Sequence, residues 1–345
     1  MGSARTSRIC GNPDSELLYC FYAINGHYET KVGQMRKILS IINEKFAWVL
    51  VSVLIIILAF LSPLNLHPFH MLQTIKSVTA YALIALGQTL VVLTGCVDLS
   101  TGPLAVLTML FTSQWARGNN FSLIWIIPSL IGIGVVTGLF NGVFVSFLKV
   151  EPMIMTLVTG TVLQGVYLLY TGGAPKGRIP PLIRGVATGT IAAAIPQAVV
   201  LLLVIAGVLW FLTKWTTLGR RVYYVGSSRR AAWLSGTNPA TIIIIVYLVS
   251  SLLSILAGLV LGGSIGYGTL QIDVMDYSFF PLIITLIGGT NFVGAQGGVF
   301  NTIIGTINIS LLLSIVILFR VPLWGKYFIQ GLLILFALFG GRRKS

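Results

Sequence analysis

The sequence predicts an all-α polytopic membrane protein with about ten transmembrane helices, some broken by Gly/Pro motifs, and with both termini in the cytoplasm. Three observations support this fold class: the composition, the lengths of the apolar segments and the positions of the basic residues. Of 345 residues, 56% are hydrophobic and only 9% are charged, and the mean hydropathy is +0.94. Because soluble domains carry about 25% charged residues, this composition excludes a soluble globular fold.

Ten apolar segments approach the length of about 20 residues that a transmembrane helix needs. The first begins near residue 46, after a polar stretch that has no apolar core and is therefore not a cleavable signal peptide. The third and eighth segments are short and have glycine-rich breaks. In chain order, the predicted spans cover residues 46–64, 77–94, 103–115, 122–148, 152–170, 189–213, 241–261, 278–289, 299–318 and 327–339.

Basic residues determine the predicted orientation of these spans. With an even number of spans both ends lie on one side of the membrane, and fifteen of the 22 Lys and Arg residues fall on that side. The positive-inside rule therefore places both termini in the cytoplasm. The predicted parts are a cytoplasmic tail at 1–45, a transmembrane domain at 46–340 with a cytoplasmic loop at 214–240, and a basic tail at 341–345.

Charge and cysteine content narrow the function classes. A net charge of +14 would suggest nucleic-acid binding in a soluble protein, but here the basic residues lie in short loops, where they set topology. Cys10, Cys20 and Cys96 are too few and too scattered for a disulfide framework or a metal site. We find no nucleophile motif or zinc-ligand cluster, so a membrane enzyme is disfavoured and no cofactor bound by this chain is expected.

Asp98 is the single charged residue between Lys76 and Arg117. An ionised carboxylate in an apolar segment costs roughly 2.5–3.5 kcal/mol on insertion scales, so it usually faces a bundle interior or a polar pathway. Gly95 and Gly102 allow the helix to break around it. Two roles are open: Asp98 binds a solute, or it caps a half-helix, which is the more ordinary use of Asp and is favoured.

The cytoplasmic loop contains more than the basic residues that topology requires, with Trp233 among its apolar side chains. Ser227 or Ser228 is placed to cap a short helix over residues 229–234, and Gly236 to end it. From the residues alone, two interpretations have equal weight. The helix docks into a groove on a soluble partner, or it lies on anionic lipid at the membrane surface.

A series of short stretches, in a consistent order, carries a family resemblance. They read SPLNLHPF at 62–69, ALGQTLVVLTGCVDLSTG at 85–102, EPMIMTL at 151–157, YTGGAP at 170–175, TLGRRVYYVG at 217–226, AAWLSG at 231–236 and LIGGTNFVGAQGG at 286–298. Together they resemble the permease subunits of bacterial ABC importers for monosaccharides, the ribose, xylose and arabinose type, with their autoinducer-2 relatives. The similarity covers residues 60–340.

The resemblance implies a multi-pass permease subunit of the bacterial inner membrane that is not itself an enzyme. Its implied partners are a second permease subunit (the same chain or a paralogue), a cytoplasmic ABC ATPase that holds ATP and Mg²⁺, and a periplasmic solute-binding protein, with no nucleic acid. It also favours the docking interpretation of the loop. The implied coupling residues are Leu218, Gly219, Arg220, Arg221, Gly226, Arg229, Arg230, Ala231, Ala232, Trp233, Leu234, Ser235 and Gly236.

A permease of this kind needs a path that passes a polar solute without binding it tightly. Small and hydroxyl-bearing residues near helix breaks suit this task. The predicted pathway residues form two clusters: Gly95, Asp98, Ser100, Thr101 and Gly102 in the first, and Gly288, Gly289, Thr290 and Asn291 in the second.

The predicted outer loop at 172–184 contains Lys176, Arg178 and Arg184. Periplasmic binding proteins of this class commonly dock through acidic residues, so the three are candidate docking residues. A solvated loop with incidental charge is an equal alternative.

The sequence departs from the family pattern at 277–283, which reads YSFFPLI in place of an acidic stretch, and this departure leaves the solute open. The alternative functions are a branched-chain amino-acid or nucleoside ABC permease and an ion-coupled secondary carrier. A carrier is the weaker of these, because carriers usually have ionisable residues at membrane depth and Asp98 is the one available here.

Overall fold

The computed structural model describes residues 47–62, 67–191, 195–292, 294–322, 324–325 and 327–332. The chain divides into two compact units, Met1–Phe46 and Ala47–Ser345, and every described residue belongs to the second. Most of those residues are helical, and the described strands form a single antiparallel pair, so the predicted all-α class is confirmed. The predictions for the tails at 1–45 and 341–345 lie outside the described residues.

An apolar helix at Ala47–Leu61 comes first. Proline begins several of the later helices, because its fixed φ suits the first turn and its missing N–H is not needed there. The order is α2 (Pro68–Ser77), α3 (Thr79–Leu93), α4 (Thr101–Ala116), α5 (Leu123–Ser146), α6 (Pro152–Thr171), α7 (Pro181–Thr188), β1 (Thr190–Ile191), β2 (Ile195–Pro196), α8 (Gln197–Trp215), α9 (Thr217–Ser227), α10 (Arg229–Leu234), α11 (Pro239–Ile265), α12 (Asp276–Ile287) and α13 (Val299–Leu318).

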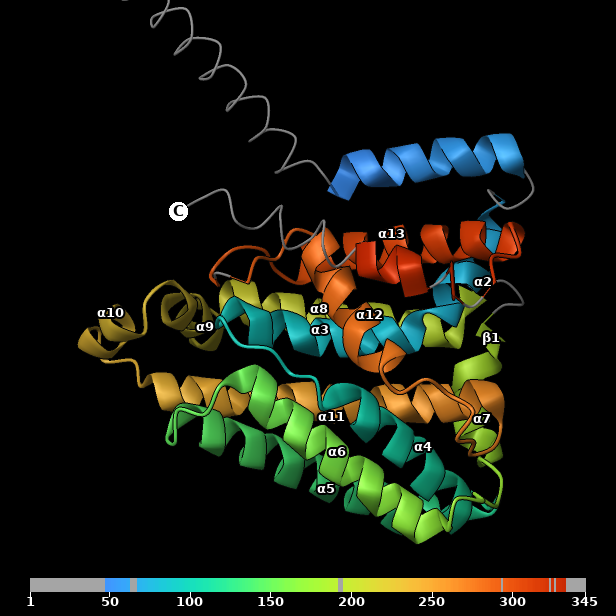
Figure 1. Ribbon diagram of the computed structural model, residues 1–345, viewed down its shortest axis with the longest axis horizontal. Coiled ribbons are helices and arrows are strands. Elements are labelled where there is room, and N and C mark those ends of the chain that lie inside the picture. Colours follow the sequence, from blue (N-terminus) through green and yellow to red (C-terminus); the bar gives the residue numbers. More distant parts are fainter. Residues whose placement is uncertain are drawn as a thin grey trace, which may run out of the picture. The chain divides into compact units, whose positions relative to one another are not determined.

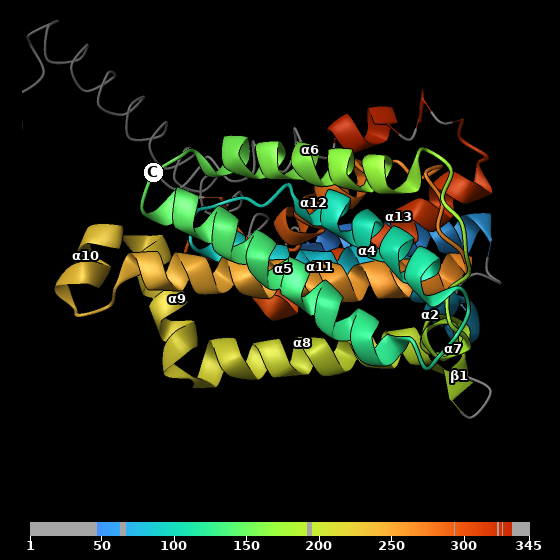
Figure 2. The same cartoon turned by 90° about the horizontal axis from the view of Figure 1, so that it is seen from below.

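Helix α11 lies among the other helices and packs against α3, α4, α5 and α7 (Figures 1 and 2). Glycine lets backbones approach closely at these contacts. A Cβ atom on Gly138 of α5 would lie 2.7 Å from the Cα atom of Leu248, and one on Gly258 of α11 would lie 2.3 Å from the carbonyl oxygen of Ala105. Small residues of this kind are typical where membrane helices cross, because packing rather than hydrophobic exclusion holds them together.

Helices α9 and α10 lie at one end of the helix assembly, and α2, α7 and β1 lie at the other, in both views (Figures 1 and 2). Residues 214–240 and 172–184, which the sequence places on opposite sides of the membrane, therefore lie at opposite ends of the helices. Each end carries different candidate functional residues.

Among the described residues, five helices are long and apolar enough to cross a membrane: α5, α6, α8, α11 and α13. A sixth span results if α2 and α3, which are bent by 63° relative to each other, are counted as one. The helix at Ala47–Leu61 and α12 are apolar but shorter. Ten spans therefore stay a prediction, and the last predicted span is described only to residue 332.

The predicted span at 189–213 was wrong at its start. Helix α8 begins at Gln197, because Thr190 and Ile191 pair as a strand with Pro196 and Ile195 just before it. Ile191 and Ile195 are apolar in strands, which hydropathy alone does not distinguish from a helix. Helix α7 at the end of the predicted outer loop was also not predicted.

Candidate functional site

The first predicted break is present between α3 and α4. Helix α3 ends at Leu93, Gly95 has a φ of +73°, and α4 begins at Thr101. Glycine adopts this left-handed conformation without strain, which ends the helix cleanly. The interruption leaves backbone N–H and C=O groups that need partners from outside the helix.

Asp98 lies in this break with 1% of its surface exposed. Its Oδ1 atom accepts hydrogen bonds from the backbone N–H of Ser100 (3.1 Å) and from the Ser100 hydroxyl (2.6 Å), and its Oδ2 atom accepts one from the Ser250 hydroxyl (2.9 Å). The bond to the Ser100 N–H is the turn that Asp makes with the residue two positions on. Asp98 thus fixes Ser100, the residue that precedes α4. Its hydrogen bond to the backbone lies just before the first turn of α4 rather than within it.

The network around Asp98 extends into α5 and α6. The Asn141 Nδ2 atom donates to the Ser100 hydroxyl (2.9 Å), and the Thr159 hydroxyl donates to Asn141 Oδ1 (2.6 Å). Asn141 and Thr159 are both buried. Buried polar groups that satisfy each other in this way rigidify their surroundings.

Two further side chains hold the backbone of the break. With its amide oriented to complement the Asp98 backbone, Gln88 of α3 donates to the Asp98 carbonyl (3.1 Å) and accepts from the Asp98 N–H (3.2 Å). The Tyr247 hydroxyl of α11 donates to the Val97 carbonyl (2.9 Å). Neither Gln88 nor Tyr247 was among the residues predicted for this site.

Leu99 is held on both sides. Its N–H donates to the Thr156 hydroxyl of α6 (3.0 Å), and its carbonyl accepts from the Ser278 hydroxyl of α12 (2.9 Å). Both partners were missed from the sequence. A sequence feature could have identified them: each is a hydroxyl residue within or at the edge of an apolar span, and polar groups in such positions are usually hydrogen-bonded.

The second predicted break, between α12 and α13, lies against the first. Gly289, Gly294 and Gly297 have positive φ values of +102°, +85° and +106°. The Thr290 hydroxyl accepts from the Gly298 N–H at 3.4 Å, inside the same turn. The Ala295 N–H donates to the Leu93 carbonyl at the end of α3 (2.9 Å), so the backbones of the two breaks are joined beside the predicted pathway clusters.

Helix α9 contacts both breaks. A Cβ atom on Gly226 would lie 1.9 Å from the Leu93 carbonyl oxygen and 2.8 Å from the Ala295 nitrogen, so only glycine fits between them. The Tyr223 hydroxyl donates to the Gly297 carbonyl (2.9 Å). Burial raises the pKa of the Tyr223 hydroxyl, which keeps it protonated as a donor.

The predicted short helix in the cytoplasmic loop is confirmed as α10. The Ser228 hydroxyl accepts from the Ala231 N–H (3.2 Å) as its N-cap, and Gly236 follows its end with a φ of +78°. Arg229 also reaches the first break, where its guanidinium donates to the Cys96 sulfur (3.4 Å).

Most of the predicted coupling residues lie on the surface of α9 and α10. Trp233 and Leu234 are 67% and 72% exposed, whereas Ala232 and Gly219 are buried and fix the two helices in place. An exposed aromatic and an aliphatic side chain with arginines around them are features of interface hot spots. The other exposed coupling residues are Leu218, Arg220, Arg221, Arg229, Arg230, Ala231, Ser235 and Gly236.

The predicted docking residues lie at the opposite end. Lys176, Arg178 and Arg184 are all exposed. Their loop is held by its backbone: the Gly118 N–H donates to the Arg178 carbonyl (2.9 Å), and the Ser113 hydroxyl donates to the Lys176 carbonyl (3.4 Å). The three positive charges are therefore presented from a fixed loop and from α7.

Two hollows border α13, one at each end. The first lies beside α2 and includes Ser314 and Arg320; the second, of about 380 Å³, lies beside α8 and α9 and includes Asn301. The predicted pathway residues line neither hollow. Four of them, Asp98, Ser100, Thr101 and Thr290, are at most 2% exposed, so in this conformation the predicted clusters are closed.

Comparison with known proteins places the chain among transport components. The profile described as "Branched-chain amino acid transport system / permease component" matches residues 70–338. No solved structure matches the chain significantly.

Curated relatives are similar over most of their length. The ribose import permease protein RbsC of Bacillus subtilis is 31% identical over 299 residues, covering 85% of this chain and 91% of that protein. Its namesake in Haemophilus influenzae is 29% identical over 298 residues, with the same coverage of both chains. The autoinducer 2 import system permease protein LsrC of Escherichia coli is 26% identical over 302 residues, covering 87% of each.

Proposed function

This chain belongs to the family of branched-chain amino acid transport system permease components, and from that membership we propose that it is the membrane subunit of an ABC importer. It forms the path by which a monosaccharide or a similar small polar solute crosses the bacterial inner membrane. Hydrolysis of ATP, with its Mg²⁺, takes place on a separate cytoplasmic ATPase, and this chain binds no cofactor. Two permease subunits, identical or paralogous, make one pathway.

The observation that carries this proposal is the contact of α9 with both helix breaks. An ATPase that binds the exposed face of α9 and α10 displaces a helix in which Gly226 lies against Leu93 and Ala295. Movement at the cytoplasmic surface then reaches both helix breaks, which contain the predicted pathway clusters, without an intermediate element. Coupling between the ATPase-binding face and the pathway requires an element with two states whose equilibrium both sites shift.

The proposed topology has ten spans with both termini in the cytoplasm. It follows from the positive-inside rule and agrees with the placement of α9 and α10 at the end opposite to α2 and α7. The loop with Lys176, Arg178 and Arg184 then faces the periplasm, where it meets a solute-binding protein.

The proposed solute class rests on the names of the relatives, which are permeases for ribose and for autoinducer 2. The family description itself names branched-chain amino acids. Uptake of D-ribose and L-leucine by the complete importer therefore separates the two candidate classes. Leucine uptake without ribose uptake would overturn the sugar assignment and leave the permease assignment standing.

Replacing residues 220–233 by a Gly/Ser linker is expected to abolish co-purification of an ATPase with this chain in mild detergent. The linker removes Arg229, Trp233 and the face that α10 presents, and interface anchors of this type contribute about 2 kcal/mol or more each. Mass spectrometry of the material that co-purifies from the native membrane measures the outcome. Trp215→Ala, at the exposed end of α8, is the matched control and should retain the ATPase. Recovery of the unaltered chain alone in several detergents would favour a carrier or channel.

Reversing the three outer charges (Lys176→Glu, Arg178→Glu and Arg184→Glu) is expected to weaken binding of the solute-binding protein about tenfold or more at low salt. Charged groups at the rim of an interface act mainly on the association rate, and salt screens them. Titration of labelled binding protein onto the importer in nanodiscs measures the change. Arg117→Glu, exposed at the end of α4, is the control for charge alone. Unchanged binding at low salt would support the interpretation of a solvated loop with incidental charge.

A further inference from the structure

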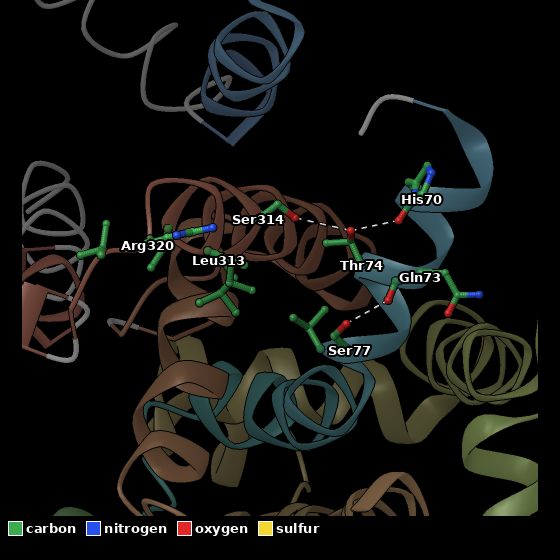
Figure 3. A pocket seen from close by; sticks show the side chains of 11 residues that line it. His70, Gln73, Thr74, Ser77, Leu313, Ser314 and Arg320 are labelled. Atoms are coloured by element: carbon green, nitrogen blue, oxygen red, sulfur yellow. Dashed lines mark hydrogen bonds between the residues drawn. The ribbon is translucent and has the colours of Figure 1, made fainter. Parts of the chain in front are cut away.

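A hollow lies between α2 and the C-terminal half of α13, and hydroxyl groups line it from both helices (Figure 3). Its volume is about 570 Å³, within the range of roughly 300–1,000 Å³ that is usual for small-molecule sites. Thr74 and Ser77 belong to α2 and Ser314 to α13, and the guanidinium of Arg320 points toward Ser314 from the turn that follows α13. His70 and Gln73 of α2 also line the hollow, and its apolar lining residues are Val78, Leu313, Val316, Ile317 and Val321.

The hydroxyl groups in this hollow offer acceptors, because each hydroxyl proton already has a partner within the protein. Thr74 donates to the carbonyl four residues earlier (3.0 Å), Ser77 does the same (2.9 Å), and so does Ser314 (3.0 Å). The Ser314 hydroxyl also lies 3.4 Å from the Thr74 hydroxyl, to which it can donate in place of its backbone carbonyl (Figure 3). A hydroxyl oxygen that donates in this way keeps capacity to accept. Arg320 supplies only N–H donors. The hollow thus combines acceptors on the helices with donors at its rim.

We propose that this hollow, here named the α2–α13 site, is the outer receiving site for a neutral polyhydroxylated solute, an inference that rests on the transport function proposed above. Every hydroxyl of such a solute both donates and accepts, so it can donate to Thr74, Ser77 or Ser314 while accepting from Arg320. A cation is repelled by Arg320, and none of the described residues that line the hollow carries a carboxylate. An anion pairs with Arg320, but its oxygen atoms only accept hydrogen bonds and would face the acceptor oxygens of Thr74, Ser77 and Ser314.

A row of hydroxyls on α13 joins the α2–α13 site to the second glycine-rich break. Thr302, Thr306, Ser310 and Ser314 are spaced four residues apart, which places them on one ridge of the helix. The Thr302 hydroxyl donates to the Gly298 carbonyl at the start of this row (3.3 Å). Thr302, Thr306 and Ser310 are at most 2% exposed, so this row is closed in the present conformation. Once it is open, its successive weak polar contacts are what a pathway needs in order to pass a solute without holding it.

Labelling of a cysteine at position 314 tests the site directly. The Ser314→Cys variant, in the complete importer in membrane vesicles, is treated with a membrane-impermeant maleimide, and modification at that residue is quantified by mass spectrometry. Millimolar D-ribose is expected to slow the labelling severalfold, whereas ribose 5-phosphate and L-leucine are not. Asn119→Cys, an exposed position in the loop between α4 and α5 on the same proposed outer side, is the control and should be labelled at a rate that ribose does not change.

Substitution of Arg320 tests the site through transport. Arg320→Gln is expected to lower ribose uptake about tenfold, as loss of one charge-assisted hydrogen bond does, and Arg320→Lys to restore part of it. Arg117→Gln is an unusually close control, because Arg117 is also exposed and also adopts a left-handed conformation after a helix, with φ 47° against 49° for Arg320. It should leave uptake unchanged.

The outcomes separate this inference from the proposed function. If the unaltered importer takes up no ribose or related sugar, the proposed solute class fails. If it takes up ribose while labelling at 314 is unaffected and Arg320→Gln transports normally, the α2–α13 site is wrong and the pathway lies elsewhere. Protection by ribose 5-phosphate but not by ribose would overturn the neutral class and identify an anion site.

Discussion

Gly226→Ala is expected to lower ATP-driven solute uptake about 10- to 100-fold while the chain still inserts into the membrane. The added Cβ atom would lie 1.9 Å from the Leu93 carbonyl oxygen, and that oxygen already accepts from Ala295. Because both neighbours are backbone atoms, α9 must move. Overpacking of this kind costs about 1–3 kcal/mol. When an energy of that size is lost from the coupling between the ATPase and the pathway, the coupled activity falls by about 5–150-fold.

The measurement compares uptake with ATP hydrolysis in proteoliposomes that contain the complete importer. Displacement of α9 from the two breaks should leave ATP hydrolysis present but no longer stimulated by solute-loaded binding protein. Gly207→Ala is the matched control, because Gly207 is also in a helix and an added Cβ atom meets nothing within 4 Å. Normal coupling in Gly226→Ala would contradict the proposed role of this contact.

Asp98→Leu is expected to destabilise the chain by about 3–5 kcal/mol, the usual cost of breaking a buried charged network. The leucine side chain accepts none of the three hydrogen bonds that Asp98 receives, so the Ser100 N–H and the hydroxyls of Ser100 and Ser250 lose their acceptor. Unsatisfied buried donors cost about 1–3 kcal/mol each. Thermal unfolding in detergent, followed by the fraction of monodisperse protein, measures the loss.

Asp98→Asn distinguishes the two roles that the sequence left open. Asparagine still accepts from the Ser100 N–H through its Oδ1 atom, so a structural role predicts a smaller loss of stability and near-normal uptake at low temperature. A role in solute binding predicts the reverse, with stability largely kept and uptake lost. Ser250→Ala, which removes one donor to Asp98 from α11, should resemble the structural outcome.

Local sequence features predicted much of the fold. The predicted limits of 122–148, 152–170 and 299–318 differ from α5, α6 and α13 by at most two residues. Helix α10 was also predictable, since the serine cap, the six helical residues, Ser235 and Gly236 follow one another in the chain. The start of α8 was not, because the apolar residues of paired strands and those of a helix contribute equally to hydropathy.

The sequence by itself determined the class of this protein: a polytopic helical permease with two glycine-rich breaks and a basic loop at 214–240 that contains Trp233. These features depend on composition and on neighbouring residues. Only the tertiary structure decided what each break touches. Val97 is bonded by Tyr247, Leu93 by Ala295, and Gly226 lies between two breaks that are far apart in the chain. The physical reason is that an interrupted helix in a membrane must take its missing hydrogen bonds from other helices, and their identity depends on packing rather than on local pattern.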